Sequence, residues 1–307
     1  GNIDEDPQFA DPENGDYSLQ FTSPCIDAGD PNSELDPDGT IADIGAFYFD
    51  QIEFPIIEGC ADPGADNYNP DVNIENPLEC INNGPTYYVS PEGNDFFGIG
   101  TEQNPFMTIQ KGIDMAVDGD TVLVSSGTYN LNTAIQFSGK NIYVLGENTD
   151  STIINGSDFY SSAVKIYDGS SNASLENFTV INSGQDVCAS HDGAIVVSSS
   201  DIILKNLKII DSKARGIEFI NSNSSLENID ILDGSGNCEG GGFKAYQSNL
   251  IIESITIDSM IGSIGGGIYI HQSELVLNNS TISNNTAYHN GGGIYSHESI
   301  LNINNTK

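Results

Sequence analysis

The chain has 307 residues, of which 37% are hydrophobic, and it contains no tryptophan. Its formal net charge is −35, and 23 acidic side chains precede the first basic residue, Lys111. Nucleic acid is therefore not expected as a partner, because phosphate groups would be repelled. No apolar run is long enough to cross a bilayer, so membrane insertion is not expected either.

Residues 1–50 are acidic and contain few alternating strand patterns. Their scattered apolar side chains are too few to form a core alone, so we expect them to cover an open end of another structure. Cys25 is the odd cysteine of five and is expected to be buried and free.

The motif Glu-x-Asp-x-Asp-Gly, which begins at Glu34, has the spacing of the first half of a calcium loop. An EF-hand is rejected because Gly45 stands where the closing bidentate glutamate is needed. Calcium held in another way, as a candidate cofactor with Asp36, Asp38 and Asp43 as ligands, is one interpretation. A solvated acidic turn is the other.

Residues 51–84 have the proline, asparagine and aspartate content of a linker, and Cys60 and Cys80 bound a loop within them. We expect a disulfide between these two cysteines, because small segments with little core need covalent cross-links. Two reduced thiols in a linker are the alternative.

A short helix is predicted next, because four apolar residues are spaced like one helical face: Ile109, Ile113, Ala116 and Val117. The turn at residues 118–120 ends it, and residues 121–124 are predicted as the first strand. Such a helix can cover the exposed edge at the end of a stack of strands.

A repeat follows, marked by a glycine before each short strand: Gly193, Gly216, Gly242, Gly267 and Gly293. Apolar residues alternate within each unit, which indicates strands. A single unit cannot bury its own apolar face, so the units are predicted to stack as coils of a parallel β-helix.

Asparagine recurs at one turn of these coils, at Asn177, Asn206, Asn228, Asn279 and Asn305. Stacked asparagines can bond to one another and to the turn backbone, which satisfies polar groups that a bare turn leaves unpaired. We therefore predict a structural ladder along these residues.

Residues 86–307, with TYYVSPEGND, GTEQNPFMTIQKGIDMAVDGDTVLVSSGTY and GKNIYVLGENTDSTIING, resemble the opening of secreted bacterial right-handed β-helix proteins of the pectate-lyase-like superfamily. Residues 4–50, with DPQFADPENGDYSLQFTSPCIDAGDP and DPDGTIADIGAFYFD, resemble the closing segment of such a domain. The stretch GCADPGADNYNPDVNIENPLEC resembles a Cys-bounded spacer of large bacterial surface proteins. The resemblance implies the fold far more than any activity.

The expected architecture is all-β: a right-handed parallel β-helix with a short N-terminal capping helix, preceded by a small β/loop closing segment. Residues 1–50 would close a preceding module, residues 51–84 would be an acidic linker, and residues 85–307 would form a β-helix that is incomplete at its C-terminus. A closing segment that precedes an opening one indicates a string of like modules.

Cys188 and Cys238 are predicted in the same corner of coils two apart. Two coil spacings are about 9.6 Å, which exceeds the usual Cα separation of a disulfide, so both loops would have to lean together. A disulfide between these two cysteines and two separate thiols both stay open.

Catalysis on this fold by polysaccharide lyases needs clustered carboxylates and a basic residue near the abstracted proton. The weak candidates are Asp192, Asp211 and Arg215, in a chain where a chance cluster of carboxylates is expected. Outward columns at His271/His297 and Tyr269/Tyr295 indicate ordinary stacking between coils, with a sugar-stacking or metal-binding face as the alternative.

The expected function is a structural module of a large extracellular or cell-surface protein, such as an adhesin, stalk or fibre. A polysaccharide lyase or glycoside hydrolase and a carbohydrate-binding module are the alternatives. The expected partners are like modules of the same protein or neighbouring subunits, with extracellular glycans as a further candidate.

Overall fold

The chain is described from a computed structural model and divides into two compact units, residues 1–83 and residues 84–307. The described residues are 3–4, 6–20, 22–50, 58–59, 74–75, 84–156, 161–184, 193–236 and 238–307. Cys60 and Cys80 lie outside them, so their disulfide stays a prediction. In the described part of the chain, no helix has the length and apolarity needed to cross a membrane.

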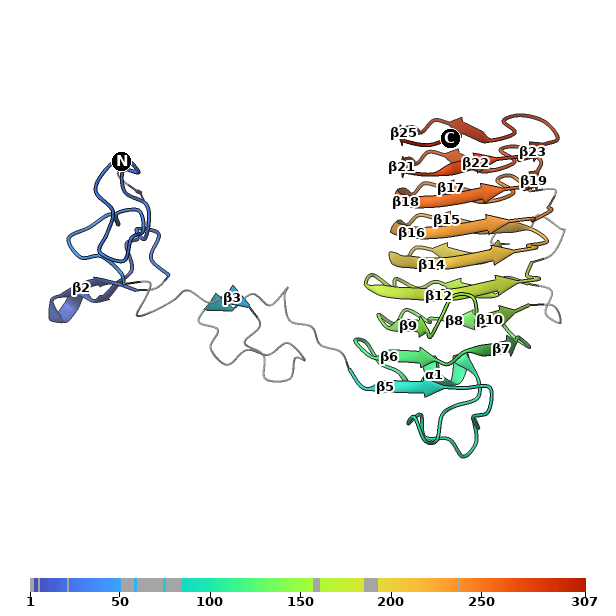
Figure 1. Cartoon of the computed structure of the whole chain (residues 1–307), viewed down its shortest axis with the longest axis horizontal. Coiled ribbons are helices and arrows are strands. Elements are labelled where there is room, and N and C mark those ends of the chain that lie inside the picture. Colours follow the sequence, from blue (N-terminus) through green and yellow to red (C-terminus); the bar gives the residue numbers. More distant parts are fainter. Residues whose placement is uncertain are drawn as a thin grey trace. The chain divides into compact units, whose positions relative to one another are not determined.

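Residues 84–307 form a right-handed parallel β-helix, which confirms the predicted fold class (Figure 1). One sheet stacks β5 (Thr86–Val89), β6 (Thr121–Val124), β9 (Tyr143–Gly146), β12 (Ala173–Ile181), β14 (Ile202–Ile210), β16 (Asn223–Leu232), β18 (Asn249–Asp258), β21 (Glu274–Asn278) and β25 (Ile300–Asn304). Its extensions are β7 (Gly127–Asn130), β10 (Thr152–Asn155) and β22 (Thr281–Ser283).

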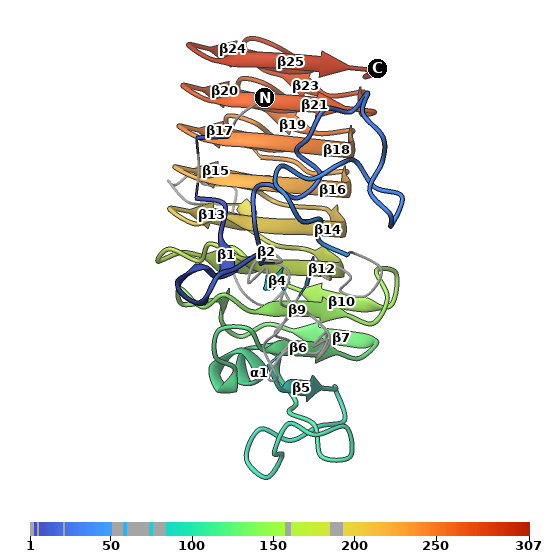
Figure 2. The same ribbon diagram turned by 90° about the vertical axis from the view of Figure 1, so that its left-hand side faces the viewer.

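A second sheet is visible as a stack in Figure 2 and forms another wall of the β-helix. Its strands are β8 (Ile135–Gln136), β11 (Val164–Ile166), β13 (Gly193–Ser198), β15 (Arg215–Ile220), β17 (Phe243–Tyr246), β20 (Ile268–His271) and β24 (Ile294–His297). The short strands β19 (Ile261–Gly262) and β23 (Thr286–Ala287) pair with each other.

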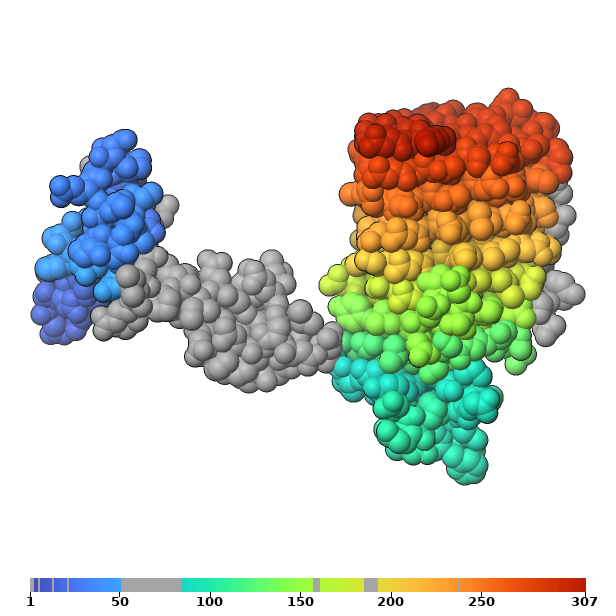
Figure 3. Space-filling model, viewed as in Figure 1, coloured from blue at the N-terminus to red at the C-terminus, as the bar shows by residue number. Residues whose placement is uncertain are grey.

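The core runs through the middle of the coils as one continuous cluster. Alternate residues of each strand point inward, so Ile268 and Ile270 of β20 are fully buried, while Tyr269 and His271 point outward. The space-filling view shows the coils stacked in sequence order as successive bands (Figure 3). Each coil therefore completes the apolar core of its neighbours.

The strand pairing corrects one detail of the predicted repeat. Gly193 pairs with Arg215, so Ala194, rather than Gly193, is the counterpart of Gly216. The later glycines keep the predicted alignment, because Ile217 pairs with Phe243 and Phe243 with Ile268. Glycine is thus a reliable marker of the coil start in the later units and is displaced by one residue in the first.

The first coil is covered by helix α1 (Ile109–Met115), whose N-cap Thr108 accepts a hydrogen bond from the Lys111 amide. Ile109 and Ile113 are buried, as predicted, but Val117 is 64% exposed because the helix ends before it. The prediction that residues 121–124 form the first strand is wrong, since β5 precedes β6 and pairs with it in parallel.

The corners of the coils use left-handed backbone conformations at residues other than glycine, which side chains with local hydrogen bonds tolerate best. The predicted asparagine ladder lies at one such corner, where every member has a positive φ: Asn177, Asn206, Asn228, Asn279 and Asn305. Asn206 donates to Asn177 Oδ1 at 2.9 Å and accepts from Asn228 at 3.1 Å. Asn305 donates to Asn279 Oδ1 at 3.3 Å.

A serine ladder occupies a second corner. The amide of Ser222 donates to Ser248 Oγ at 3.2 Å, and the amide of Ser248 donates to Ser273 Oγ at 3.0 Å. The amide of Ser273 donates in turn to Ser299 Oγ at 3.1 Å. These hydroxyls pair backbone amides between coils at a bend, where strand pairing lapses.

The N-terminal unit contains the antiparallel pair β1 (Phe9–Asp11) and β2 (Asp16–Leu19), joined through the 3₁₀ turn η1 (Pro12–Asn14). Further along the chain, β3 (Glu58–Gly59) pairs with β4 (Ile74–Glu75). Loops connect the remaining described residues up to residue 50. Cys25 is buried and free, as predicted.

Candidate functional site

The outward face of the second sheet carries charged, aromatic and imidazole side chains in two columns. In-register pairing places Glu218, Lys244, Tyr269 and Tyr295 in one column on β15, β17, β20 and β24. A neighbouring column on the last strands contains Tyr246, His271 and His297. Both columns follow from the two-residue period of a strand, because inward and outward positions repeat from coil to coil.

A buried ionic cluster lies at the start of this face. Glu218 Oε1 is 3.4 Å from Arg215 Nη1 and 3.5 Å from Lys244 Nζ, and the Glu218 side chain is 1% exposed. Lys244 Nζ also lies 3.2 Å from Glu239 Oε2, and Arg215 Nε donates to the Glu239 carbonyl oxygen at 2.8 Å. Glu218, the buried carboxylate of this group, is thus paired with two cations, as a buried charge requires.

The phenols beside this cluster are held in their neutral form. Burial raises the pKa of Tyr167, and the negative charge of Glu218 raises it further. Burial also raises the pKa of Tyr269, with an added contribution from Glu239. Neither tyrosine is therefore prepared to act as a base, and the charge of Glu218 is already compensated by Arg215 and Lys244.

The tyrosine column is stacked along the β-helix axis. The rings of Tyr269 and Tyr295 are 5.5 Å apart and inclined by 11°, so each ring covers a face of the other. Tyr269 is only 8% exposed, and Lys244 Nζ lies 5.8 Å from its ring centroid. A sugar-binding platform needs an exposed ring face, so this geometry favours stacking between coils.

The structure describes two of the three predicted catalytic candidates, and each of these two forms an ion pair. Asp211 pairs with Lys213 at 2.5 Å, and both side chains are about half exposed. Arg215 is instead 4% exposed and pairs with Glu218. Asp192 lies outside the described residues. Sequence reasoning missed Lys244 as a member of the cluster, although it shares an outward position with Tyr269 in the next coil.

The predicted calcium ligands serve as acceptors for backbone amides. Asp43 accepts from the amides of Asp27 and Phe49, both at 2.7 Å, and its own amide donates to Asp36 Oδ2 at 2.8 Å. Asp38 accepts from the amide of Thr40 at 3.1 Å. Burial raises the pKa of Asp43. Calcium binding by Asp36, Asp38 and Asp43 stays a prediction.

Cys238 is 1% exposed in the β-helix unit. Its predicted partner, Cys188, lies outside the described residues, so the Cys188–Cys238 disulfide stays a prediction.

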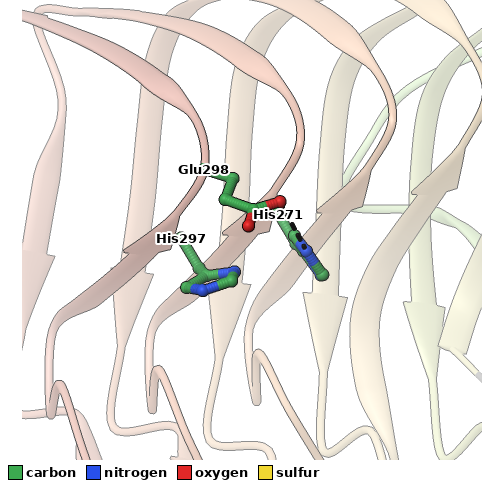
Figure 4. Close-up of side chains that lie close together, drawn as sticks. All are labelled: His271, His297 and Glu298. Atoms are coloured by element: carbon green, nitrogen blue, oxygen red, sulfur yellow. Dashed lines mark ion pairs between the residues drawn. The ribbon is translucent and has the colours of Figure 1, made fainter.

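A group that can hold a metal ion lies further along the same face. The ligand atoms of His271, His297 and Glu298 lie within 4.8 Å of one another (Figure 4). His271 Nε2 is 3.8 Å from Glu298 Oε2. Two imidazoles and one carboxylate are donors that transition metals accept.

A depression of about 350 Å³ lies elsewhere, beside α1 and β7. Met107, Tyr129 and Leu131 are among its lining residues, none of which has a carboxylate, imidazole, guanidinium or ammonium group. The Tyr129 hydroxyl donates to the Ser125 carbonyl oxygen at 2.9 Å, and burial raises its pKa. This depression therefore lacks groups for acid–base catalysis.

Comparison with solved structures finds several proteins of similar fold. A rhamnogalacturonan lyase matches with a TM-score of 0.51 and 18% identity, over 72% of this chain and 62% of that protein. XylC in complex with xylose matches with a TM-score of 0.43 and 9% identity, over 72% of this chain and 70% of that protein. The pectin methylesterase from carrot matches with a TM-score of 0.41 and 16% identity, over 73% of this chain and 83% of that protein.

The chain thus spans less than two thirds of the rhamnogalacturonan lyase, and identities this low show the fold alone. A comparison with curated proteins gives no match. The model of the family described as the right handed beta helix region matches residues 162–307. Together, the family match and the parallel coils support a right-handed β-helix family for this part of the chain.

Proposed function

We propose that this chain is a structural module of a large extracellular or cell-surface protein, in which its β-helix acts as a rigid spacer. The observation that carries the proposal is the pair of side-chain ladders along the corners, of which the asparagine ladder is interrupted at Ser254 and the serine ladder runs on to Ser299. Asn206 bonds to asparagines in the coils on both sides, and Ser248 links the coils before and after it. Ladders of this kind reinforce stacking between the coils that they join.

The charged face supports the same proposal. The buried carboxylate of Glu218 is paired with Arg215 and Lys244, and the face of Tyr269 is stacked on Tyr295. These side chains bond to one another within the protein and do not present free polar groups or ring faces to a substrate. The proposed partners are like modules of the same protein or neighbouring subunits.

A polysaccharide lyase or glycoside hydrolase is the second candidate, since Glu218, Glu239, Arg215 and Lys244 bring carboxylates and cations together. Turnover by this cluster requires a substrate to reach Glu218, which is 1% exposed. A local rearrangement would have to precede catalysis.

The full chain can be tested against a panel of acidic and neutral polysaccharides. Ultraviolet absorbance would detect unsaturated uronates, and a reducing-end assay would detect hydrolysis. We expect no turnover by either readout. Turnover that disappears in Lys244→Met would overturn the structural proposal in favour of the enzyme.

The mechanical role has its own measurement. Pulling the full chain through handles at residues 84 and 307 should extend it in successive steps, because each coil contacts only its neighbours. Asn206→Ala should lower the force of the step that contains its coil. Extension at forces typical of an unfolded chain would contradict the proposed spacer.

A further inference from the structure

Three side chains with metal-binding atoms meet where β20 and β24 end. Parallel pairing sets His271 directly beside His297, and their ring centroids are 4.8 Å apart. Glu298 follows with a left-handed φ of 50°, and its carboxylate approaches the imidazole of the preceding coil. Figure 4 shows the three side chains grouped beside these two strands.

The spacing is close to that of a zinc site. Tetrahedral zinc with donor distances of about 2.0–2.1 Å separates its ligand atoms by roughly 3.3 Å. The ligand atoms of His271, His297 and Glu298 lie within 4.8 Å of one another, so small side-chain rotations would bring them to a common ion. His271 is 25% exposed and Glu298 is 59% exposed, which leaves room for that movement.

Neighbouring side chains orient two of the ligands. Gln272 Nε2 donates to Glu298 Oε2 at 2.9 Å, and Gln272 in turn accepts from Gln247 at 3.1 Å. The ring of Tyr246 meets that of His271 edge to face at 5.3 Å. Metal-binding carboxylates are commonly held by such second hydrogen bonds, which lower the cost of ordering them.

An ordinary ion pair explains less of this arrangement. The distance of 3.8 Å between His271 and Glu298 is long for a direct hydrogen bond. It also involves only two of the three side chains, whereas strand pairing brings His297 to the same place. A shared cation would bond to all three side chains and would be drawn to a chain with a net charge of −35.

We propose that His271, His297 and Glu298 bind a divalent transition metal ion, of which zinc fits best, and that the ion fastens the coil of β20 to the coil of β24. Imidazole donors select such ions over calcium and magnesium, which prefer oxygen. A water molecule or an external donor would complete the coordination. The site does not depend on the proposed structural role of the module.

Zinc affinity can be measured on the full chain by competition with a chromophoric chelator, in excess calcium that occupies sites made of carboxylates alone. One zinc ion per chain is expected. His271→Ala, His297→Ala and Glu298→Gln should each weaken binding by roughly tenfold or more, and Gln272→Ala by about tenfold. His289→Ala is the matched control, because it removes an exposed histidine outside the group and should leave affinity unchanged.

Cobalt provides a second readout, since three protein donors in a tetrahedral site should give visible absorption bands that His297→Ala abolishes. Circular dichroism of each variant would show that the β-helix is retained. The proposal is overturned if zinc binds with equal affinity to wild type and the three ligand variants, if calcium displaces it at comparable concentration, or if His289→Ala weakens it as much as His297→Ala.

Discussion

The β-helix and the N-terminal unit bury their side chains in different ways. In residues 84–307, inward positions of successive strands merge into one apolar core. Among the described residues of the N-terminal unit, Leu19 and Cys25 are the buried apolar side chains, whereas Tyr17 is 51% exposed and Phe47 57% exposed. A coil in a repeat buries its apolar side chains against neighbouring coils, whereas a short segment has no repeated neighbour to bury them.

The shorter unit relies on polar turns instead. Asp43 accepts hydrogen bonds from the amides of Asp27 and Phe49, and Asp16 accepts from the amide of Ser18 at 3.0 Å. Such bonds fix local backbone conformation but contribute only about 1 kcal/mol each. The fold of this unit is thus specified by its turns, and its exposed aromatic residues suit it to cover another apolar surface.

Truncation of a core side chain should give the largest difference in stability loss between the two units. Phe219 is fully buried and packs against Phe243, with ring centroids 5.6 Å apart. Phe219→Ala should lower the free energy of unfolding of the β-helix by about 3–5 kcal/mol, because it leaves a cavity. Leu19→Ala should cost the N-terminal unit about 2 kcal/mol, since its surroundings can collapse more easily.

Hydrogen exchange on the full chain would measure the loss of stability in each unit separately, because the amides of each unit report on its own unfolding. Tyr17→Ala is the control and should change stability by less than about 0.5 kcal/mol. Equal losses for Phe219→Ala and Leu19→Ala would show that the N-terminal unit has a core of its own.

The buried ionic cluster should produce the next largest effect. Glu218→Ala would leave Arg215 and Lys244 without their shared carboxylate, at a cost of about 3–5 kcal/mol. Asp211→Asn breaks the exposed pair with Lys213 and should cost less than about 1 kcal/mol. Denaturant midpoints of the β-helix would compare them, and similar shifts would mean that Glu218 is solvated in solution.

Much of the β-helix could be predicted from the sequence because its pattern repeats. Alternating apolar residues such as Ile268 and Ile270 point inward in every coil, so one unit predicts the next. Exact alignment was harder, because Gly193 resembles the other marker glycines while strand pairing places Ala194 in their register. Backbone pairing decides that register, and sequence similarity alone does not.

The candidate sites were less predictable. The pairing of Glu218 with Lys244 depends on two residues 26 positions apart sharing an outward column. The serine ladder was missed, although Ser222, Ser248 and Ser273 recur at coil spacing, because serine is common throughout the chain. In both cases the partners can be identified only when the length of each coil is known, because that length decides which residues lie side by side.

The asparagine ladder should give a smaller effect with two separable causes. Asn206 has a φ of 52° and bonds to Asn177 and Asn228. Asn206→Ala loses both hydrogen bonds and retains the left-handed strain, for a total of about 2–3 kcal/mol. Asn206→Gly relieves the strain and should cost about 1 kcal/mol. Thermal midpoints would rank the variants, and equal losses would show that strain is unimportant at this corner.

The smallest effect is a difference in pH dependence between the two units. Burial raises the pKa of Asp43 above its ordinary value of 3.8, and the charges of Asp36 and Asp27 add to this rise. Asp258 in the β-helix has a lowered pKa because Ser283, Ser259 and Asn284 donate to its carboxylate. The two carboxyl groups should therefore respond to acid in opposite directions.

A raised pKa in the folded state gives a contribution to stability that is present below the unfolded pKa and is lost as pH rises through the folded value. Asp43 should thus weaken the N-terminal unit as pH increases through and above the ordinary aspartate range. Asp258 contributes to stability above its unfolded pKa, and this contribution is lost as pH falls through its lowered folded pKa.

Carboxyl NMR titrations of the full chain should place the midpoint of Asp43 above 3.8 and that of Asp258 below it. Asp43→Asn and Asp258→Asn should each remove the corresponding pH dependence from hydrogen exchange in its own unit. Midpoints in the reverse order would contradict the partial burial of Asp43.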